Sequence, residues 1–361
     1  MPFGTWCLEL GTFPCVVLLS LPLSSTLFFF LHMRRPPVAI IGLGAVVALA
    51  GMVAIGFFTP TRGSRTLTLA YPSLISSALI YVAEDRGFFT QEGMEVVLQP
   101  HSVGRDAVRS LVEGKADAAV AYETPLLRQA CDGKDLVALA QLHTSERNTG
   151  LILRGTGADI VSLKGKAVGV PRGTNAEFVL QQLLRFHGLT FRDIIVKDIP
   201  LPASLEAWEK GEVQALALWN PILSDAAQAA REQTQTVFSD VYTESSVLMV
   251  RSEDSARRRG ALERLLHAFK RAERFMGEHP EEGRAIVQRN LKIPPEQLAI
   301  FWPHFDFHVT LSNVLMSILE NEAAWFRDQG ECPFPVQTEM LIDPQLLRSM
   351  DPLAVTLESK L

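Results

Sequence analysis

From residue 66 onward, short apolar segments alternate with amphipathic segments, and this alternation constrains the fold more than any other feature of the chain. Residues 66–70 and 116–121 are apolar and strand-like, whereas residues 77–84 and 104–113 carry apolar side chains at helical spacing. Strands that alternate with helices indicate βαβ units and a mainly parallel sheet. The exported part of the chain is therefore predicted to be an α/β protein.

The same order of elements begins again in the second half of the chain. Residues 113–123 read EGKADAAVAYE and residues 210–220 read KGEVQALALWN, so each half places an aromatic and then a polar residue after an apolar strand. Ligands of open α/β sheets bind at the carboxyl ends of the strands. Two such ends facing each other predict two lobes with a small-molecule cleft between them.

An uncharged apolar run precedes this pattern, over residues 38–58, with Arg34 and Arg35 on its N-terminal side. About 20 apolar residues are enough to span a bilayer as a helix, and flanking positive charge keeps that side cytoplasmic. We predict an uncleaved anchor that leaves the rest of the chain exported; a cleaved signal peptide is the alternative. Residues 1–32 are either an upstream, misassigned start or the first half of a helical hairpin.

The charge pattern and the motifs of the chain exclude several classes of function. The net charge is −6, and the basic residues are scattered rather than interleaved with aromatic residues, so no nucleic-acid partner is expected. The chain has no phosphate-binding P-loop, no Gly-x-Ser-x-Gly motif and no set of residues that suggests a nucleophilic triad. We therefore predict neither an enzyme nor a bound cofactor.

Cysteine and histidine spacing argues against a metal site. The chain has four cysteines and no Cys-x-x-Cys motif, and the sequence leaves open whether Cys131 and Cys332 form a disulfide. His304 and His308 have a spacing that can bind a metal on a helix, but Pro303 interrupts the segment and no third ligand follows. We predict that no metal is bound.

Four segments, in the same order along the chain, carry a family resemblance: residues 81–96 (YVAEDRGFFTQEGMEV), 104–117 with LVEGKAD, 163–170 (LKGKAVGV) and 217–221 (ALWNP). They resemble the sulfonate, nitrate, taurine and thiamine-pyrimidine-precursor binding proteins of ABC transporters, the NMT1/THI5-like group of type II periplasmic binding proteins. The likeness covers about residues 66–330. It departs from the family in the first loop, residues 71–77 (YPSLISS), which lacks the usual glycine.

The resemblance implies two lobes joined by two crossovers, near residues 156 and 246, with a ligand cleft between the lobes. The apolar run adds an N-terminal transmembrane or signal helix before them, and a permanent anchor is unusual for a freely diffusing receptor. The C-terminal helices are expected to pack mostly on the first lobe. The predicted organisation is an N-terminal export or anchor region (1–65), a first lobe (66–155 plus 247–330), a second lobe (156–246) and a C-terminal tail (331–361).

Polar residues at the predicted starts of helices are the first candidate ligand contacts. Ser76 and Ser77 follow the first strand, and Thr174 and Asn175 take the matching place in the second lobe. Hydroxyl groups and free N–H groups at a helix N-terminus suit a polar or anionic ligand group. The alternative is that these residues only cap their helices.

Residues after the two matching strands are the second group of candidates. Tyr122 and Trp219 are predicted to face each other across the cleft and to present ring faces to a ligand, unless they are ordinary core residues. Glu123 can accept from a ligand N–H or pair with a cation, or it is a solvated loop charge. The predicted ligand-binding residues are Ser76, Ser77, Tyr122, Glu123, Thr124, Thr174, Asn175, Trp219 and Asn220.

These features together predict an extracytoplasmic solute-binding protein that delivers a small molecule to the permease of an ABC importer. The ligand is expected to be a sulfonate, a nitrate-like anion, or a pyrimidine or other nitrogenous compound. We place the protein on the periplasmic or cell-surface side of the inner membrane. The alternatives are a membrane-tethered sensor, or an enzyme related to thiamine-pyrimidine-precursor synthases, whose cysteine-rich signature is missing here.

Overall fold

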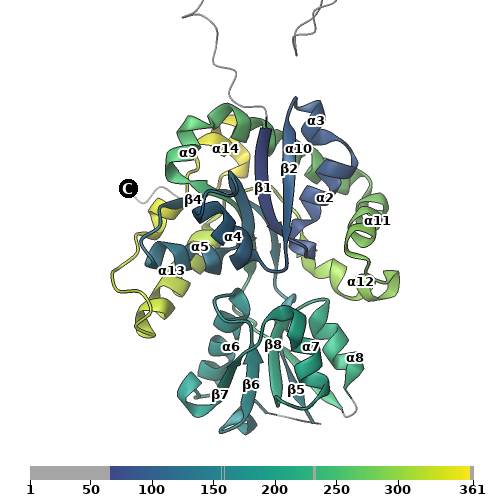
Figure 1. Cartoon of the computed structure of the whole chain (residues 1–361), viewed down its shortest axis with the longest axis vertical. Coiled ribbons are helices and arrows are strands. Elements are labelled where there is room, and N and C mark those ends of the chain that lie inside the picture. The colour runs from purple at the N-terminus through teal and green to yellow at the C-terminus, as the bar shows by residue number, and fades with distance from the viewer. Residues whose placement is uncertain (1–65, 156, 158, 231–232, 358–361) are drawn as a thin grey trace, which may run out of the picture. The chain divides into compact units, whose positions relative to one another are not determined.

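The computed structural model describes residues 66–357, apart from 156, 158, 231 and 232 (Figure 1). The predicted apolar span at 38–58 and the segment 1–32 lie outside the described residues. Within the described ranges, no helix combines the length and apolar character that a bilayer span requires.

The first lobe is built on a mixed sheet in the order β11-β4-β10-β3-β1-β2. The strand β1 is parallel to both β2 and β3, as the βαβ pattern predicts, whereas β10 runs antiparallel to β3 and β4. The strands are β1 (Thr66–Pro72), β2 (Glu95–His101), β3 (Ala118–Tyr122), β4 (Leu136–Ser145), β10 (Glu244–Arg251) and β11 (Phe305–Asp306).

The second lobe is built on a separate sheet in the order β7-β6-β8-β5-β9. The strand β6 is parallel to β7 and β8, and β5 runs antiparallel to β8 and β9. The strands are β5 (Thr149–Arg154), β6 (Ala167–Val170), β7 (Ile195–Asp198), β8 (Ala215–Trp219) and β9 (Thr234–Phe238). The α/β class and the two separate sheets agree with the prediction.

Helices cover both sheets, with α6, α7 and α8 in the second lobe and the remainder in the first (Figure 1). The long helices α10, α11 and α13 pack on helices of the first lobe, as expected for the C-terminal helices. The described helices are α2 (Ala78–Asp85), α3 (Phe88–Gln91), α4 (Gly104–Val112), α5 (Glu123–Cys131), α6 (Asn175–Phe186), α7 (Leu201–Glu209), α8 (Ile222–Ala229), α9 (Ser252–Arg257), α10 (Arg259–Glu278), α11 (Pro280–Leu291), α12 (Pro295–Phe301), α13 (Asn313–Asp328) and α14 (Gln345–Met350).

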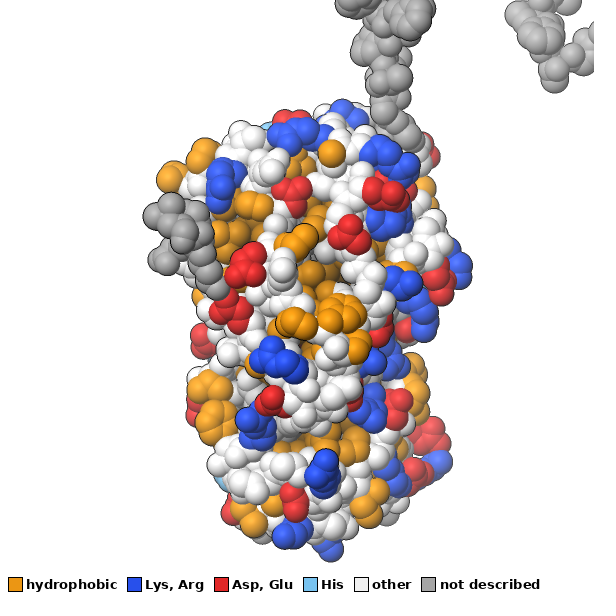
Figure 2. Space-filling model, turned by 90° about the vertical axis from the view of Figure 1, so that its left-hand side faces the viewer, with side chains coloured by type: hydrophobic (Ala, Val, Ile, Leu, Met, Phe, Trp, Pro, Cys, Tyr) orange, Lys and Arg blue, Asp and Glu red, His pale blue; other side chains and the backbone are white. Residues whose placement is uncertain are grey.

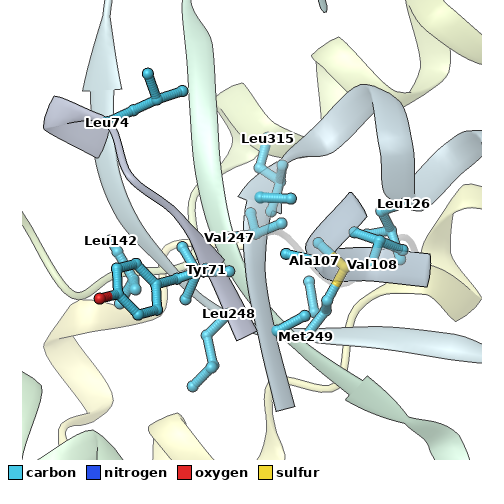
Figure 3. Close-up of a cluster of buried hydrophobic side chains, with 14 of the residues drawn as sticks. Tyr71, Leu74, Ala107, Val108, Leu126, Leu142, Val247, Leu248, Met249 and Leu315 are labelled. Atoms are coloured by element: carbon cyan, nitrogen blue, oxygen red, sulfur yellow. The ribbon is translucent and has the colours of Figure 1, made fainter. Parts of the chain in front are cut away.

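The core of the first lobe forms where β10 meets helices from both halves of the chain. Buried side chains of β10 pack with those of α4, α5, β4 and α13 (Figure 3). The residues labelled there are Tyr71, Leu74, Ala107, Val108, Leu126, Leu142, Val247, Leu248, Met249 and Leu315. A returning strand thus completes a core that residues before 150 alone would leave open.

The chain crosses between the two sheets earlier than the sequence suggested. The strand β5 belongs to the second sheet but ends before residue 156, and β10 returns to the first sheet at Glu244, before residue 246. The crossovers are therefore residues 146–148 and 239–243, rather than near 156 and 246. The chain enters the second sheet through β5, which is antiparallel to both of its neighbours. The βαβ pattern does not predict such a strand.

The predicted C-terminal tail is packed on the first lobe as far as the structure describes it. Ile342 forms a bridge with Ala138 of β4, and both Leu346 and Leu347 of α14 are buried. A disulfide joins Cys131, at the end of α5, to Cys332, 201 residues further along the chain. Disulfides typically contribute about 2–4 kcal/mol, mainly by constraining the unfolded chain. These contacts make the described part of the tail a component of the first lobe.

Gly104 allows α4 to begin close to the strand that leads into the candidate site. A Cβ atom at this position would lie 2.8 Å from the Cβ of Ala121, which real Cβ atoms do not tolerate. Glycine therefore lets the first turn of α4 pack directly on the end of β3, beside Tyr122.

Candidate functional site

The predicted ligand residues lie where strands end and helices begin. Tyr122 ends β3 and Glu123 begins α5, Trp219 ends β8, and Asn175 begins α6. Ser76 and Ser77 lie in the short 3₁₀ helix Ile75–Ser77 that follows β1. All nine predicted residues are buried in this structure, so the interpretation of Glu123 as a solvated loop charge is wrong.

A carboxyl group that the sequence analysis missed, that of Glu244, connects both crossovers with the second lobe. It accepts a hydrogen bond from Asn148 Nδ2 at 2.6 Å and another from the hydroxyl group of Thr149. Asn175 Nδ2, at the start of α6, donates to the same carboxyl group at 3.1 Å. Glu244 thus receives hydrogen bonds from the first crossover, the start of β5 and a helix N-terminus.

Two further carboxyl groups are buried in the first lobe, at and near the start of α5. Glu123 accepts from the hydroxyl group of Tyr242 and from the backbone N–H of Ser245 at 2.9 Å. Glu322 of α13 accepts from the hydroxyl group of Thr124. Each carboxyl group is fully buried or nearly so. The helices and the second crossover therefore bring three acidic side chains into the buried region where the lobes meet.

The three carboxyl groups have no basic partner among the described residues. Among the described residues, the only side chain of a basic residue within ion-pair distance of these carboxyl groups is that of His143, whose Nε2 lies 3.9 Å from Glu244 Oε1. Burial lowers the pKa of His143 to about 3, so this ring is neutral and the contact is not an ion pair. Burial also raises the pKa of Glu123 to about 7 and that of Glu244 to about 8. Burial and the charge of Glu123 raise the pKa of Glu322.

Some hydroxyl groups at the helix starts already form hydrogen bonds within the protein, and one does not. Ser77 Oγ donates to the carbonyl of Pro72 at 2.7 Å, and Thr174 Oγ1 donates to the carbonyl of Pro171 at 2.7 Å. These two groups stabilise local turns. Ser76 Oγ, by contrast, is buried without a hydrogen-bond partner.

The two predicted aromatic residues are both buried at strand ends. The Tyr122 hydroxyl accepts from Asn148 Nδ2 at 3.0 Å, and its ring lies 5.6 Å from that of His143. Trp219 pairs with Thr149 in the β5–β8 register, and its indole N–H has no partner. No ring contact joins Tyr122 and Trp219 among the aromatic pairs of the described chain, so their facing across a cleft stays a prediction.

Asn220 links the second lobe to the first crossover. Its backbone N–H donates to the carbonyl of Asn148 at 3.1 Å, and Ser224 Oγ donates to its side-chain oxygen at 2.7 Å. The Asn220–Pro221 peptide bond is cis. Asn220 therefore contacts the same crossover residue that binds Glu244.

A surface hollow of about 540 Å³ lies at the junction of the lobes, between α6 and α13. Phe178 and Trp325 line it, and their ring centroids lie 5.1 Å apart. Phe178 also packs 5.4 Å from Tyr242, whose hydroxyl group bonds to Glu123. A continuous chain of aromatic contacts therefore leads from the hollow to the buried carboxyl groups.

No metal cluster is present in the described part of the chain, and the face drawn in Figure 2 shows no basic patch. Residues 66–357, with the gaps given above, contain no group of three potential metal-ligating side chains. The two histidines considered above do not share a site, since His308 contacts Glu273 and Asp306 whereas His304 lines a different hollow. On the face drawn in Figure 2, Lys and Arg side chains are scattered among acidic and apolar ones.

Six polar residues of the site were not predicted from the sequence, although the sequence around some of them has a recognisable pattern. Glu322 stands on the otherwise apolar face of α13, between Leu319 and Phe326. The crossovers appear in the sequence as polar stretches between apolar strands. The missed residues are His143, Asn148, Thr149, Tyr242, Glu244 and Glu322.

Comparisons with known proteins agree on one family. A family model described as NMT1/THI5 like matches residues 75–283. A Brucella abortus protein to which a binding role is ascribed is 22% identical over 226 residues, covering 62% of this chain and 70% of that protein. A Bacillus subtilis protein to which binding of aliphatic sulfonates is ascribed is 23% identical over 251 residues, covering 67% of this chain and 75% of that protein.

A solved structure shows the same fold. The alkanesulfonate-binding protein SsuA from Xanthomonas axonopodis pv. citri, bound to MOPS, matches with a TM-score of 0.70 and 17% identity. The match covers 79% of this chain and 100% of that one. At this identity the likeness establishes the fold, and it confirms the two-lobed binding-protein architecture expected from the sequence.

Proposed function

Because the chain belongs to the NMT1/THI5-like family, we propose that it is a solute-binding protein that captures a small molecule between its lobes for an ABC importer. Its role is binding rather than catalysis, as the names of its relatives suggest. The permease of the importer is the partner that would receive the ligand-loaded form.

The observation that carries this proposal is the meeting of both crossovers at one buried polar cluster. Each crossover is short, and Glu244 binds residues from the first crossover, from β5 and from α6. Short connecting segments of this kind act as hinges when two lobes close on a ligand. A ligand at Glu244 would therefore contact the elements that have to move.

Ligand-dependent stabilisation tests the proposed function. Thermal unfolding of the purified protein is followed with taurine, methanesulfonate, nitrate, aminopyrimidines and small amines. A compound at a hundredfold excess over its Kd stabilises the folded state by about 2.7 kcal/mol, so at least one class should raise the melting temperature. If no compound of any class does so, the solute-binding function is rejected.

We also propose that residues 38–58 hold the protein in the inner membrane, with the two lobes on the periplasmic side. The support is the uncharged run and the preceding Arg34 and Arg35. N-terminal sequencing of the protein isolated from membranes should return a sequence that begins before residue 38. A mature N-terminus near residue 60 would show instead that the run is a cleaved signal.

A further inference from the structure

The buried cluster at the junction of the lobes contains acceptors that have no donor. Asn148 Oδ1, Asn175 Oδ1 and Glu322 Oε2 are all buried and unpartnered. Both asparagines donate from Nδ2 to Glu244. The unpaired Oδ1 of each belongs to the same side-chain amide and therefore lies close to that carboxyl group. Two acceptors without donors thus lie next to Glu244, a carboxyl group that itself has no cationic partner among the described residues.

Unpaired buried acceptors are costly and rare in folded proteins. Leaving one unsatisfied loses the solvation that water would give it, and native structures contain only a few such groups. Here the unpaired acceptors gather around three buried carboxyl groups. What the cluster lacks is a set of N–H donors and a positive charge.

The donors that remain unpaired in this region are neutral. Among the described residues they are the indole N–H of Trp219, the ring N–H of His143 and the hydroxyl groups of Ser76 and Ser246. Near the lobe junction, Arg172 pairs with Glu177 and Glu331, and Arg185 pairs with Asp328. Arg147 of the first crossover lies over the ring of Phe238 and not within ion-pair distance of the three carboxyl groups. An anion placed among Glu123, Glu244 and Glu322 would meet like charge once these groups lose their protons, and no cation there would compensate it.

Resting on the solute-binding function proposed above, we propose that the cluster of Glu123, Glu244 and Glu322 takes a small organic cation with several N–H donors. An amidinium or a protonated aminoheterocycle has this chemistry. Its N–H groups satisfy the carboxyl groups and the free amide oxygens of Asn148 and Asn175. Its charge replaces the cation that the protein does not supply.

The hollow that ring contacts connect to the cluster has matching chemistry. The hollow between α6 and α13 is lined by Phe178 and Trp325, and Phe178 packs on Tyr242 next to Glu123. Aromatic faces attract cations. The lobes open at the crossovers, and a cation then moves from these rings to the carboxyl groups.

Calorimetric titration with defined probes tests the ligand class. Benzamidine and 4-aminopyridine, both cationic at neutral pH, are compared with methanesulfonate and nitrate. We expect the cations to bind and the anions not to bind. Glu244→Gln should weaken cation binding by about ten- to hundredfold, the range for hydrogen bonds to charged groups, whereas the exposed control Glu253→Gln should leave it unchanged. Glu322→Gln serves as the second variant if Glu244→Gln does not fold.

The pH dependence gives an independent readout. The groups facing Glu244 and its neighbours are Glu123, Glu322, His143, Tyr122 and Tyr242, and the carboxyl groups lose their protons when a cation binds. Affinity for 4-aminopyridine should therefore rise from pH 6 to pH 8, while affinity for an anion would fall.

The outcomes separate this inference from the proposed function. Binding of methanesulfonate or nitrate without binding of either cation overturns the ligand class but keeps the solute-binding role. Cation binding that both Glu244→Gln and Glu322→Gln leave unchanged overturns the site. Absence of binding by every probe class, including those of the thermal screen, rejects the proposed function itself.

Discussion

The wild-type protein should lose at least about 2–3 kcal/mol of unfolding free energy between pH 6.5 and pH 8, and Glu244→Gln should remove about 1.5 kcal/mol of this loss, while Glu322 keeps contributing. Burial raises the pKa of Glu244 to about 8 and that of Glu123 to about 7, against 4.5 for an ordinary glutamate. Between the unfolded and folded pKa values the native state holds protons that the unfolded chain releases. The contribution of these carboxyl groups to stability is therefore complete at low pH and falls as pH rises, by about 1.4 kcal/mol per pH unit for each such group.

The comparison is made above pH 6.5 because His143 acts in the opposite direction below it. Burial lowers the pKa of His143 to about 3, so its contribution is present above the unfolded value of 6.5 and is lost as pH falls toward 3. Above pH 6.5 the folded ring is neutral and the unfolded ring loses its remaining proton, so His143 offsets the loss by only about 0.4 kcal/mol. Among these three residues, the change of unfolding free energy with pH above 6.5 therefore comes mainly from Glu123 and Glu244 and only slightly from His143.

Urea unfolding at pH 6.5, 7, 7.5 and 8 measures the effect. Glu253→Gln, an exposed change on the first lobe, should follow the wild-type slope. Glu244→Gln should show a flatter dependence, with Glu123 contributing only up to about pH 7. A variant that keeps the full wild-type slope would show that Glu244 titrates at an ordinary pH and is not held in a dry environment.

Trp219→Ala should lower both stability and ligand affinity. The indole is 2% exposed and belongs to the hydrophobic core that runs through both lobes, so its removal should cost about 3–5 kcal/mol. Its unpaired N–H, at the carboxyl end of β8, is available to a ligand. Stacking on an aromatic ring is worth about 1–3 kcal/mol, which predicts a tenfold to hundredfold loss of affinity.

A matched control distinguishes the two roles. Trp208→Ala makes the same change in the second lobe, where the indole is fully buried and donates to the carbonyl of Ala226 at 2.7 Å. It should lose similar stability with unchanged affinity in the folded fraction. Trp219→Phe keeps a ring but removes the N–H, and it should lose affinity with a smaller loss of stability. Unchanged affinity in both Trp219 variants would assign this residue to the core alone.

Tyr122 provides a second check of the strand-end prediction. Its hydroxyl group accepts from Asn148, and its ring contacts His143, so Tyr122→Phe leaves the ring in place while removing one acceptor of Asn148. The sequence pattern located this residue correctly at the end of an apolar strand. The sequence pattern did not indicate that the hydrogen-bond partner of Tyr122 would be Asn148, a residue of the first crossover.

The sequence by itself determined the α/β class, the two lobes and the strand ends at which the candidate residues lie. These features follow from apolar periodicity and from short motifs, which are properties of neighbouring residues. The positions of Tyr122, Glu123, Asn175 and Trp219 at the starts of helices or the ends of strands are local in the same sense.

Only the tertiary structure decided which side chains meet. Glu244 lies 96 residues from Asn148, and Glu322 lies 198 residues from Thr124, yet each pair shares a hydrogen bond. Their proximity depends on β10 returning between β3 and β4 and on α13 packing against α5. The burial that raises the carboxyl pKa values arises in the same way, because desolvation comes from segments that are distant in the chain and close only after folding.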